Sequence, residues 1–286
     1  MRRFARFACL DWSGAKSQKQ AGIALAIAGA GAKAPALVAS EGGWSREAAL
    51  DWLRERAAEG ADMLIGIDFS PALPFADKGA YFPGWAESPR DARSLWALVD
   101  RLSESDPHLA ANGALAHLEI RRHFRQYPEC GDLFGQGIGR LRETEQRADA
   151  NPASCFNLVG AKQVGKSSLT GMRVLHRLAG AIPIWPFDPA PGRGLLLVEI
   201  YTSIAARAAG RPAGRSKMRD KESLNIALGS LGSQPHPGLT RYDDHSTDAL
   251  VTAAWLRKVA GNEALWNPAG LTPDLRRTEG WTFGVG

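Results

Sequence analysis

The sequence predicts an α/β fold in which a mixed sheet, a three-stranded antiparallel meander plus two parallel strands, is flanked by helices. Three observations favour this class. Short apolar runs with brief connections open the chain, and a helical pattern then leads to a continuous apolar run at 63–68. A second continuous run follows much later, at 195–201. Continuous runs are typical of parallel strands buried on both faces, whereas brief connections favour antiparallel pairing.

The first part of the fold is expected within residues 4–68. We expect, in chain order, strands at 4–11, 21–28, 36–39 and 63–68, with a helix over 46–59 before the last of them. Ser45 is a suitable N-cap for this helix, and Leu50 and Leu53 recur at helical spacing.

Residues 70–190 interrupt this pattern with frequent prolines. We interpret them as a large, mostly helical or irregular insertion between the fourth and fifth strands of a single domain, 1–286. The remaining helices are expected near 90–103, 110–125, 169–179, 203–209, 221–231 and 244–260.

The composition narrows the functional classes. The chain has 286 residues, of which 44% are hydrophobic and 23% charged, as in ordinary globular proteins. No window reaches the roughly 18 uncharged apolar residues of a membrane span, so no membrane partner is expected. The three cysteines are too widely spaced for a disulfide framework or a zinc motif, which favours a reducing cytoplasm. The oligomeric state is left open.

Four carboxylates stand at or just after apolar runs: Asp11, Asp68, Glu199 and Asp248. A carboxylate at the edge of a buried element costs free energy unless a cation or hydrogen bond meets it. We therefore predict that the four converge on two Mg²⁺ or Mn²⁺ ions. Two alternatives stay open, because Asp68 could cap a turn and Glu199 could pair with an arginine.

The last predicted helix adds two further candidates. Asp244 lies one turn before Asp248 on the same helix face, where it either joins the site or caps the helix beside Asp243. His245 could deliver a proton or orient a water molecule, or it could be an ordinary surface histidine.

Positive charge is clustered in two stretches, 121–125 and 207–221, in a chain with net charge +5 and an isoelectric point near 9.3. Each stretch could be a solvated surface. Beside an acidic site, however, basic residues could hold a polyanion such as DNA or RNA. The candidate substrate contacts are Ser13, Lys16, Arg121, Arg122, Lys162, Lys166, Ser167 and Lys217.

Several segments match a known pattern. They are Gly-Ile-Asp-Phe at 66–69, Thr-Glu-Gln-Arg at 144–147, 163–172, Ile-Trp-Pro-Phe-Asp at 184–188, Val-Glu-Ile-Tyr at 198–201 and His-x-x-Asp-Ala at 245–249. With the order of expected elements, they resemble an uncharacterised bacterial family described as predicted RNase H-like nucleases. The resemblance covers nearly the whole chain and implies an RNase H-like fold and a nuclease. Thr202 departs from it, because proline is expected there.

A competing motif occurs at 160–167, which matches the phosphate-binding pattern G-x-x-x-x-G-K-[ST] after a possible strand at 155–159. In such a loop Lys166 would contact the β- and γ-phosphates and Ser167 a magnesium ion. The leading interpretation is a metal-dependent phosphodiester hydrolase. The second is a phosphotransferase or ATP-binding protein of the P-loop or actin-like type. The third is a non-catalytic nucleic-acid-binding protein with a remnant acidic site.

Overall fold

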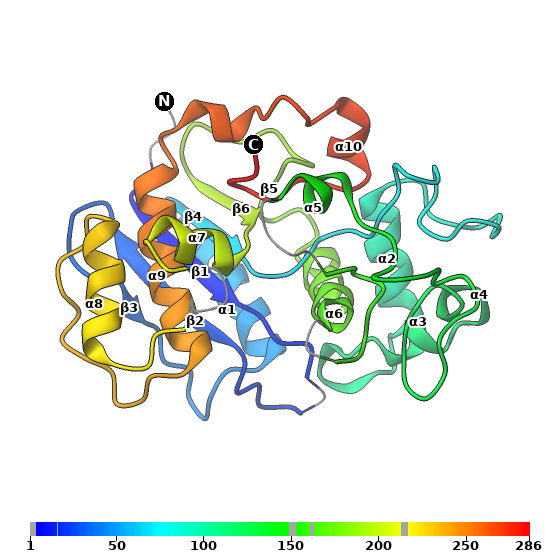
Figure 1. Cartoon of the computed structure of the whole chain (residues 1–286), viewed down its shortest axis with the longest axis horizontal. Coiled ribbons are helices and arrows are strands. Elements are labelled where there is room, and N and C mark those ends of the chain that lie inside the picture. The colour runs from blue at the N-terminus through cyan, green and yellow to red at the C-terminus, as the bar shows by residue number, and fades with distance from the viewer. Residues whose placement is uncertain (1–3, 16, 149–152, 161–162, 213–216) are drawn as a thin grey trace.

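A mixed β-sheet forms the centre of the molecule (Figure 1). The computed structural model describes residues 4–15, 17–148, 153–160, 163–212 and 217–286. Within these residues the sheet has six strands in the order β3-β2-β1-β4-β6-β5. The strands are β1 (Arg6–Asp11), β2 (Ala24–Gly29), β3 (Ala36–Leu37), β4 (Met63–Ile67), β5 (Ile184–Trp185) and β6 (Leu195–Glu199).

The sheet combines the two expected pairing modes. β2 pairs antiparallel with both β1 and β3, whereas β4 is parallel to β1, β6 to β4, and β5 to β6. The predicted α/β class with a mixed sheet flanked by helices is therefore confirmed.

Two strand predictions within the insertion need correction. Three parallel strands, and not the predicted two, follow the antiparallel meander. The third is β5, because Ile184 and Trp185 pair with β6 and extend the edge of the sheet. Two residues are too few to show a strand periodicity. The possible strand at 155–159 is not part of this sheet, and among the described residues only Asn157 forms an isolated bridge there, with Arg125.

Helices cover both faces of the sheet. The long ones are α1 (Arg46–Ala58), α2 (Ala92–Leu102), α6 (Val164–Arg177), α8 (Lys221–Ser230) and α9 (Asp244–Val259). The short ones are α3 (Asn112–Ala116), α4 (Leu118–Arg121), α5 (Glu143–Arg147), α7 (Thr202–Ala208) and α10 (Pro273–Arg277), with 3₁₀ turns at Pro107–Leu109 and Glu263–Trp266. None of the helices in the described ranges is long and apolar enough to cross a lipid bilayer.

Local chemistry explains where the best-predicted helices begin. The Ser45 side chain accepts a hydrogen bond from the backbone N–H of Ala48, and the Asp243 side chain accepts one from Ser246. Each satisfies an amide that the first helical turn leaves unpaired. α6 begins at Val164, five residues before the expected start at 169, and the expected helix over 110–125 is divided into α3 and α4.

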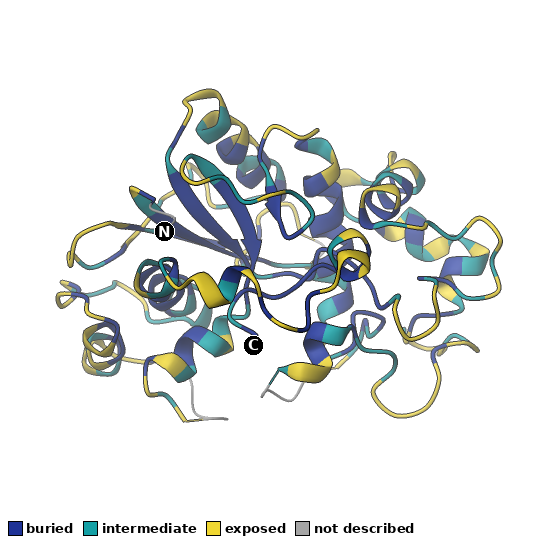
Figure 2. Ribbon diagram, turned by 90° about the horizontal axis from the view of Figure 1, so that it is seen from above, coloured by how far each residue is buried: buried dark blue, intermediate teal, exposed yellow. Residues whose placement is uncertain are grey.

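The sheet separates two apolar cores. One contains residues of α1, α2 and α6, so the predicted insertion is integrated into the molecule, and the other contains residues of α7, α8, α9 and the C-terminal segment. Figure 2 shows the central strands as mostly buried and the outer loops as mostly exposed. Ile67 and Leu197 belong to the first core, whereas Leu64 and Val198 belong to the second. Neighbouring residues of one strand thus lie on opposite faces, which decides where the carboxylates point.

Candidate active site at the ends of β1 and β4

Asp11 and Asp68 lie side by side at the carboxyl ends of two neighbouring parallel strands. Asp11 is the last residue of β1, and Asp68 directly follows β4. Leu10 pairs with Ile67, and the backbone N–H of Asp68 donates to the Leu10 carbonyl at 3.1 Å. Side chains along a strand alternate between the two faces of the sheet. By this alternation Asp11 and Asp68 both fall on the face that carries residues of the second core, which is the face covered by α9.

The opposite face of the same strand ends is anchored to α6. The rings of Trp12 and Phe69, which follow the two aspartates, have centroids 5.4 Å apart. Trp12 Nε1 donates to Thr170 Oγ1 at 3.0 Å. A Cβ atom on Gly171 would lie 2.3 Å from the Phe69 ring, so the close approach of α6 requires glycine there. These contacts fix the backbone from which Asp11 and Asp68 project.

Helix α9 brings two more predicted residues to this place. His245 Nδ1 lies 2.9 Å from Asp11 Oδ2, and the Asp248 side chain is only 12% exposed. The hydroxyl of Thr202, at the start of α7, donates to Asp68 Oδ2 at 3.3 Å. The structure therefore brings His245 into contact with Asp11, and it places Asp11, Asp68 and Asp248 close enough for their charges to interact.

Two basic side chains oppose these carboxylates. Lys217 Nζ lies 3.1 Å from Asp244 Oδ2 and 3.4 Å from Asp248 Oδ2. Arg219 Nη1 lies 2.6 Å from Asp244 Oδ1. Asp244 is thus held by cations at the margin of the site. Lys217, which was predicted to contact substrate, instead forms ion pairs with Asp244 and Asp248.

The three inner carboxylates perturb one another. Burial raises the pKa of Asp68 well above its usual value, and the nearby charges of Asp11 and Asp248 raise it further. Burial raises the pKa of Asp248 to about 6, although Lys217 acts against this change. Burial also raises the pKa of Asp11, with the hydrogen bond to His245 opposing it. The hydrogen bond with Asp11 in turn raises the pKa of His245. Three largely buried carboxylates therefore share one region, where a bound cation would reduce their mutual repulsion.

These carboxylates suit a divalent cation chemically. Asp11, Asp68 and Asp248 offer only oxygen donors, which Mg²⁺ and Mn²⁺ prefer. Within the described part of the chain, however, no group of three or more His, Cys, Asp or Glu side chains is arranged as a finished metal site. The donor set fits such an ion, and binding would require the side chains to turn toward a common point.

Glu199 does not join the aspartates, which corrects the predicted cluster of four carboxylates. Glu199 pairs in register with Ile67, and it lies two residues after Leu197 on the same face of β6. Its side chain therefore faces the first core. Arg142 donates to both its oxygens, at 3.0 Å and 2.5 Å, and Thr282 Oγ1 donates at 3.0 Å. The alternative considered from the sequence, an ion pair with an arginine, is what the structure contains.

The basic patch of the insertion is internally neutralised. Arg121 pairs with Glu129 at 3.2 Å, and Arg122 pairs with Glu119 and Asp132 at 3.2 Å and 2.8 Å. Because both arginines are engaged with acidic neighbours, a nucleic acid would have to compete with these pairs.

Other predicted substrate contacts lie nearer the aspartates. Lys166 and Ser167 are in the first turn of α6, and a Cβ atom on Gly14 would lie 2.5 Å from the Ser167 backbone nitrogen. The loop after β1 therefore packs against the start of α6. A Cβ on Gly22 would lie 3.0 Å from Ser13 Oγ and 3.2 Å from His245 Nε2, so these groups share one small region. Lys16 and Lys162 lie outside the described residues.

Sequence reasoning missed three residues of this arrangement. Thr202 follows a buried strand, so its place at a strand end was a usable signal. Arg219 stands in the same basic stretch as Lys217. Arg142 gave no signal, because its role depends on contacts with residues far away in the chain.

The chain was also compared with known proteins. No family model, no curated protein and no solved structure matches it.

Proposed function

We propose that the protein is a divalent-metal-dependent hydrolase that cleaves phosphodiester bonds in DNA or RNA, with Asp11, Asp68 and Asp248 as its metal-binding residues. One observation carries the proposal: three largely buried carboxylates at neighbouring strand and helix ends lie close enough that, beside the larger effect of burial, the charge of Asp11 raises the pKa of both other aspartates. Buried carboxylates that repel one another favour a cation, and α/β sheets place their sites at the carboxyl ends of strands.

The residues of this cluster and its neighbours would have different roles in the reaction. A bound Mg²⁺ or Mn²⁺ ion supplies an activated water and stabilises the leaving oxygen. Asp11, Asp68 and Asp248 would hold the ion. The His245 side chain is 43% exposed beside Asp11, so it can exchange a proton with water or substrate. Lys217, which lies 3.4 Å from Asp248 Oδ2, would be placed to contact a phosphate if a bound ion took over its contact with this carboxylate.

The finer fold assignment, an RNase H-like sheet, belongs to this proposal. It is supported by an antiparallel meander followed by parallel strands on the β1 side of the sheet, in the order expected from the resemblance. The basic isoelectric point near 9.3 suits a nucleic-acid substrate.

The rival P-loop interpretation has less support. A phosphate-binding loop of that type connects a sheet strand to a helix. Ahead of α6, the described part of the chain contributes no strand of the central sheet between 155 and 159. Glu199, which could have served as its acidic partner, is engaged by Arg142.

A cleavage assay tests the proposal. Single-stranded, duplex and branched DNA and RNA would be incubated with Mg²⁺, Mn²⁺ or EDTA. We expect metal-dependent cleavage that Asp11→Asn reduces by more than the roughly 10–100-fold typical of outer-shell partners of a metal. The matched control is Asp51→Asn, an exposed position on α1.

Cleavage that survives both EDTA and Asp11→Asn would exclude this mechanism. Binding of nucleic acid without any cleavage would instead favour the non-catalytic interpretation.

A further inference from the structure

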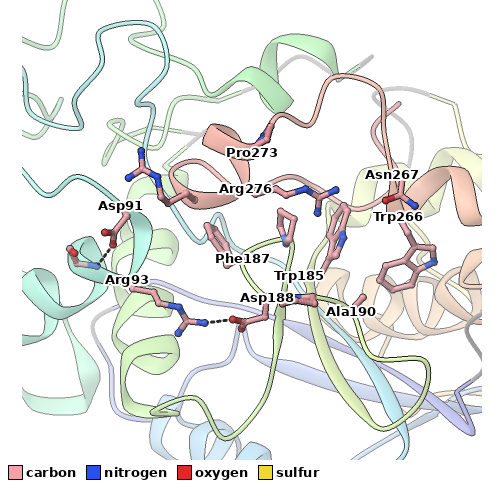
Figure 3. A pocket seen from close by; sticks show the side chains of 14 residues that line it. Asp91, Arg93, Trp185, Phe187, Asp188, Ala190, Trp266, Asn267, Pro273 and Arg276 are labelled. Atoms are coloured by element: carbon pink, nitrogen blue, oxygen red, sulfur yellow. Dashed lines mark hydrogen bonds and ion pairs between the residues drawn. The ribbon is translucent and has the colours of Figure 1, made fainter.

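A hollow of about 810 Å³ lies at the β5 edge of the sheet, with β6 between it and the strand that carries Asp68. Pockets for small molecules usually measure about 300–1,000 Å³. Three separate segments form the walls: the loop 185–190 after β5, the start of α2, and residues 266–277 (Figure 3). None of the aspartates of the candidate active site lines it.

One side of the hollow is a rigid apolar wall. Trp185 and Trp266 meet edge to face, with centroids 5.8 Å apart, and both are almost fully buried. The Phe187 ring packs edge-on against Trp96 at 5.3 Å. A Cβ atom on Gly280 would lie 2.6 Å from the Phe187 ring, so the backbone at Gly280 packs closely against this ring. The wall is therefore formed before any ligand arrives.

The acidic groups of the hollow are already occupied. Asp188 pairs with Arg93 at 2.5 Å and also accepts a hydrogen bond from the backbone N–H of Ile184. Asp91 accepts a hydrogen bond from the backbone N–H of Ser94 at the start of α2. Asp188 is thus neutralised by Arg93, whereas Asp91 keeps its charge and is oriented by the start of α2.

Arg276 is the exception among the charged groups. Three arginines and two aspartates line the hollow, which leaves one positive charge in excess. Arg93 is paired with Asp188, and Arg277 donates to the Arg90 carbonyl at 2.7 Å. No residue in the described ranges forms an ion pair or a side-chain hydrogen bond with Arg276. Figure 3 shows its side chain reaching from α10 across the hollow toward Trp185.

We propose that this hollow binds a small anion carried on a flat ring, with Arg276 pairing with the anionic group and the partly exposed Phe187 ring, supported by the buried tryptophans, contacting the flat ring. A guanidinium presents a planar fork of N–H donors that matches a carboxylate or a phosphate. A flat ring gains both dispersion and apolar burial against an aromatic wall. The site is independent of the proposed hydrolase chemistry, since it uses none of its residues.

Calorimetric titration in EDTA tests this site with defined probes. Adenosine monophosphate and indole-3-carboxylate each combine a ring with an anion, whereas adenosine and inorganic phosphate each supply one half. We expect at least one ring-bearing anion to bind about tenfold or more tightly than adenosine and phosphate. A preference between the two distinguishes a phosphate from a carboxylate as the natural anion.

Variants assign the binding to the hollow. Arg276→Gln should weaken it about tenfold, and Arg276→Lys, which keeps the charge but loses the fork, should weaken it less. Arg54→Gln, an exposed change on α1, and Asp68→Asn in the candidate active site should leave it unchanged. The proposal is overturned if neither ring-bearing anion binds more tightly than adenosine and inorganic phosphate, or if Arg276→Gln binds as well as the unaltered protein.

Discussion

The same end of the sheet carries two groups of carboxylates on opposite faces, and the basic side chains that contact them differ in burial. Glu199 and Glu145 lie under the first core, where the fully buried Arg142 donates to both of them. Asp11, Asp68 and Asp248 lie toward α9. Lys217 contacts Asp248 and His245 contacts Asp11, and these two basic side chains are 47% and 43% exposed.

The difference separates a structural carboxylate from a candidate functional one. Arg142 also donates to Ser70 Oγ and to the Glu279 carbonyl, both at 3.0 Å, so its group joins the sheet, the insertion and the C-terminal segment. The aspartates have no partner of this kind in the described part of the chain. Burial raises the pKa of Glu199 as it raises those of the aspartates, so the two groups differ in their contacts and not in the direction of the pKa shift. A carboxylate at a strand end is a stronger candidate for function when no fully buried arginine engages it.

The largest expected effect comes from removing the structural cation. Arg142→Met should destabilise the fold by about 3–5 kcal/mol, because it leaves buried carboxylates without their counter-charge. Urea denaturation followed by circular dichroism measures the loss. Arg121→Met is the matched control, since its pair with Glu129 is exposed and contributes little. A loss below about 1 kcal/mol for Arg142→Met would remove the contrast between the two faces.

The next effect is the pH dependence of the aspartate face in the absence of metal. The pKa of Asp248 in the folded protein is about 6, above its usual 3.8, so the folded state binds this proton more tightly than the unfolded state. The contribution of Asp248 to stability therefore falls as the pH rises from about 4 through 6. A gap of about two pH units corresponds to at most about 3 kcal/mol.

Thermal melts in EDTA at several pH values measure this effect. Asp248→Asn should be more stable than the unaltered protein at pH 8, and the advantage should shrink steadily toward pH 4. Asp51→Asn, on exposed α1, should show no such trend. An Asp248→Asn protein that is less stable at pH 8 would mean that Lys217 already balances the carboxylate.

A smaller effect is expected when the competing cation is removed. Lys217 occupies oxygen atoms of Asp244 and Asp248 that a metal ion would need. Lys217→Gln should therefore raise the affinity for Mn²⁺ several-fold in a calorimetric titration, because the ion no longer has to displace an ammonium group. Lys221→Gln, at the start of α8, serves as the control. Unchanged affinity would show that Lys217 and the ion do not share a position.

Much of the fold could be predicted because its signals are local. The apolar runs of β1 and β4, the Ser45 cap and the spacing of α9 each depend on residues close together in the chain. β5 could not be predicted, since Ile184 and Trp185 become a strand only by pairing with β6. A strand of two residues is too short to show a sequence pattern, so only its pairing identifies it.

The candidate site divides in the same way. Asp11 and Asp68 follow from strand ends, and Asp248 and His245 follow from helix spacing. The face on which Glu199 lies depends on its register with Ile67, and its partner Arg142 is 57 residues away in the chain. Neither the register nor the distant partner can be read from residues near Glu199 in the chain. The sequence alone therefore left open whether Glu199 is a metal ligand or part of an ion pair.

One measurement tests the central claim that the aspartate face, and not Glu199, holds the metal. Mn²⁺ would be titrated by calorimetry into the unaltered protein, Asp68→Asn and Glu199→Gln, with circular dichroism confirming that each is folded. We expect a loss of affinity of about tenfold or more for Asp68→Asn. For Glu199→Gln we expect an affinity within about twofold of the unaltered protein, even though its fold is weakened. Loss of Mn²⁺ binding in Glu199→Gln, with full binding in Asp68→Asn, would show that Glu199 holds the metal instead.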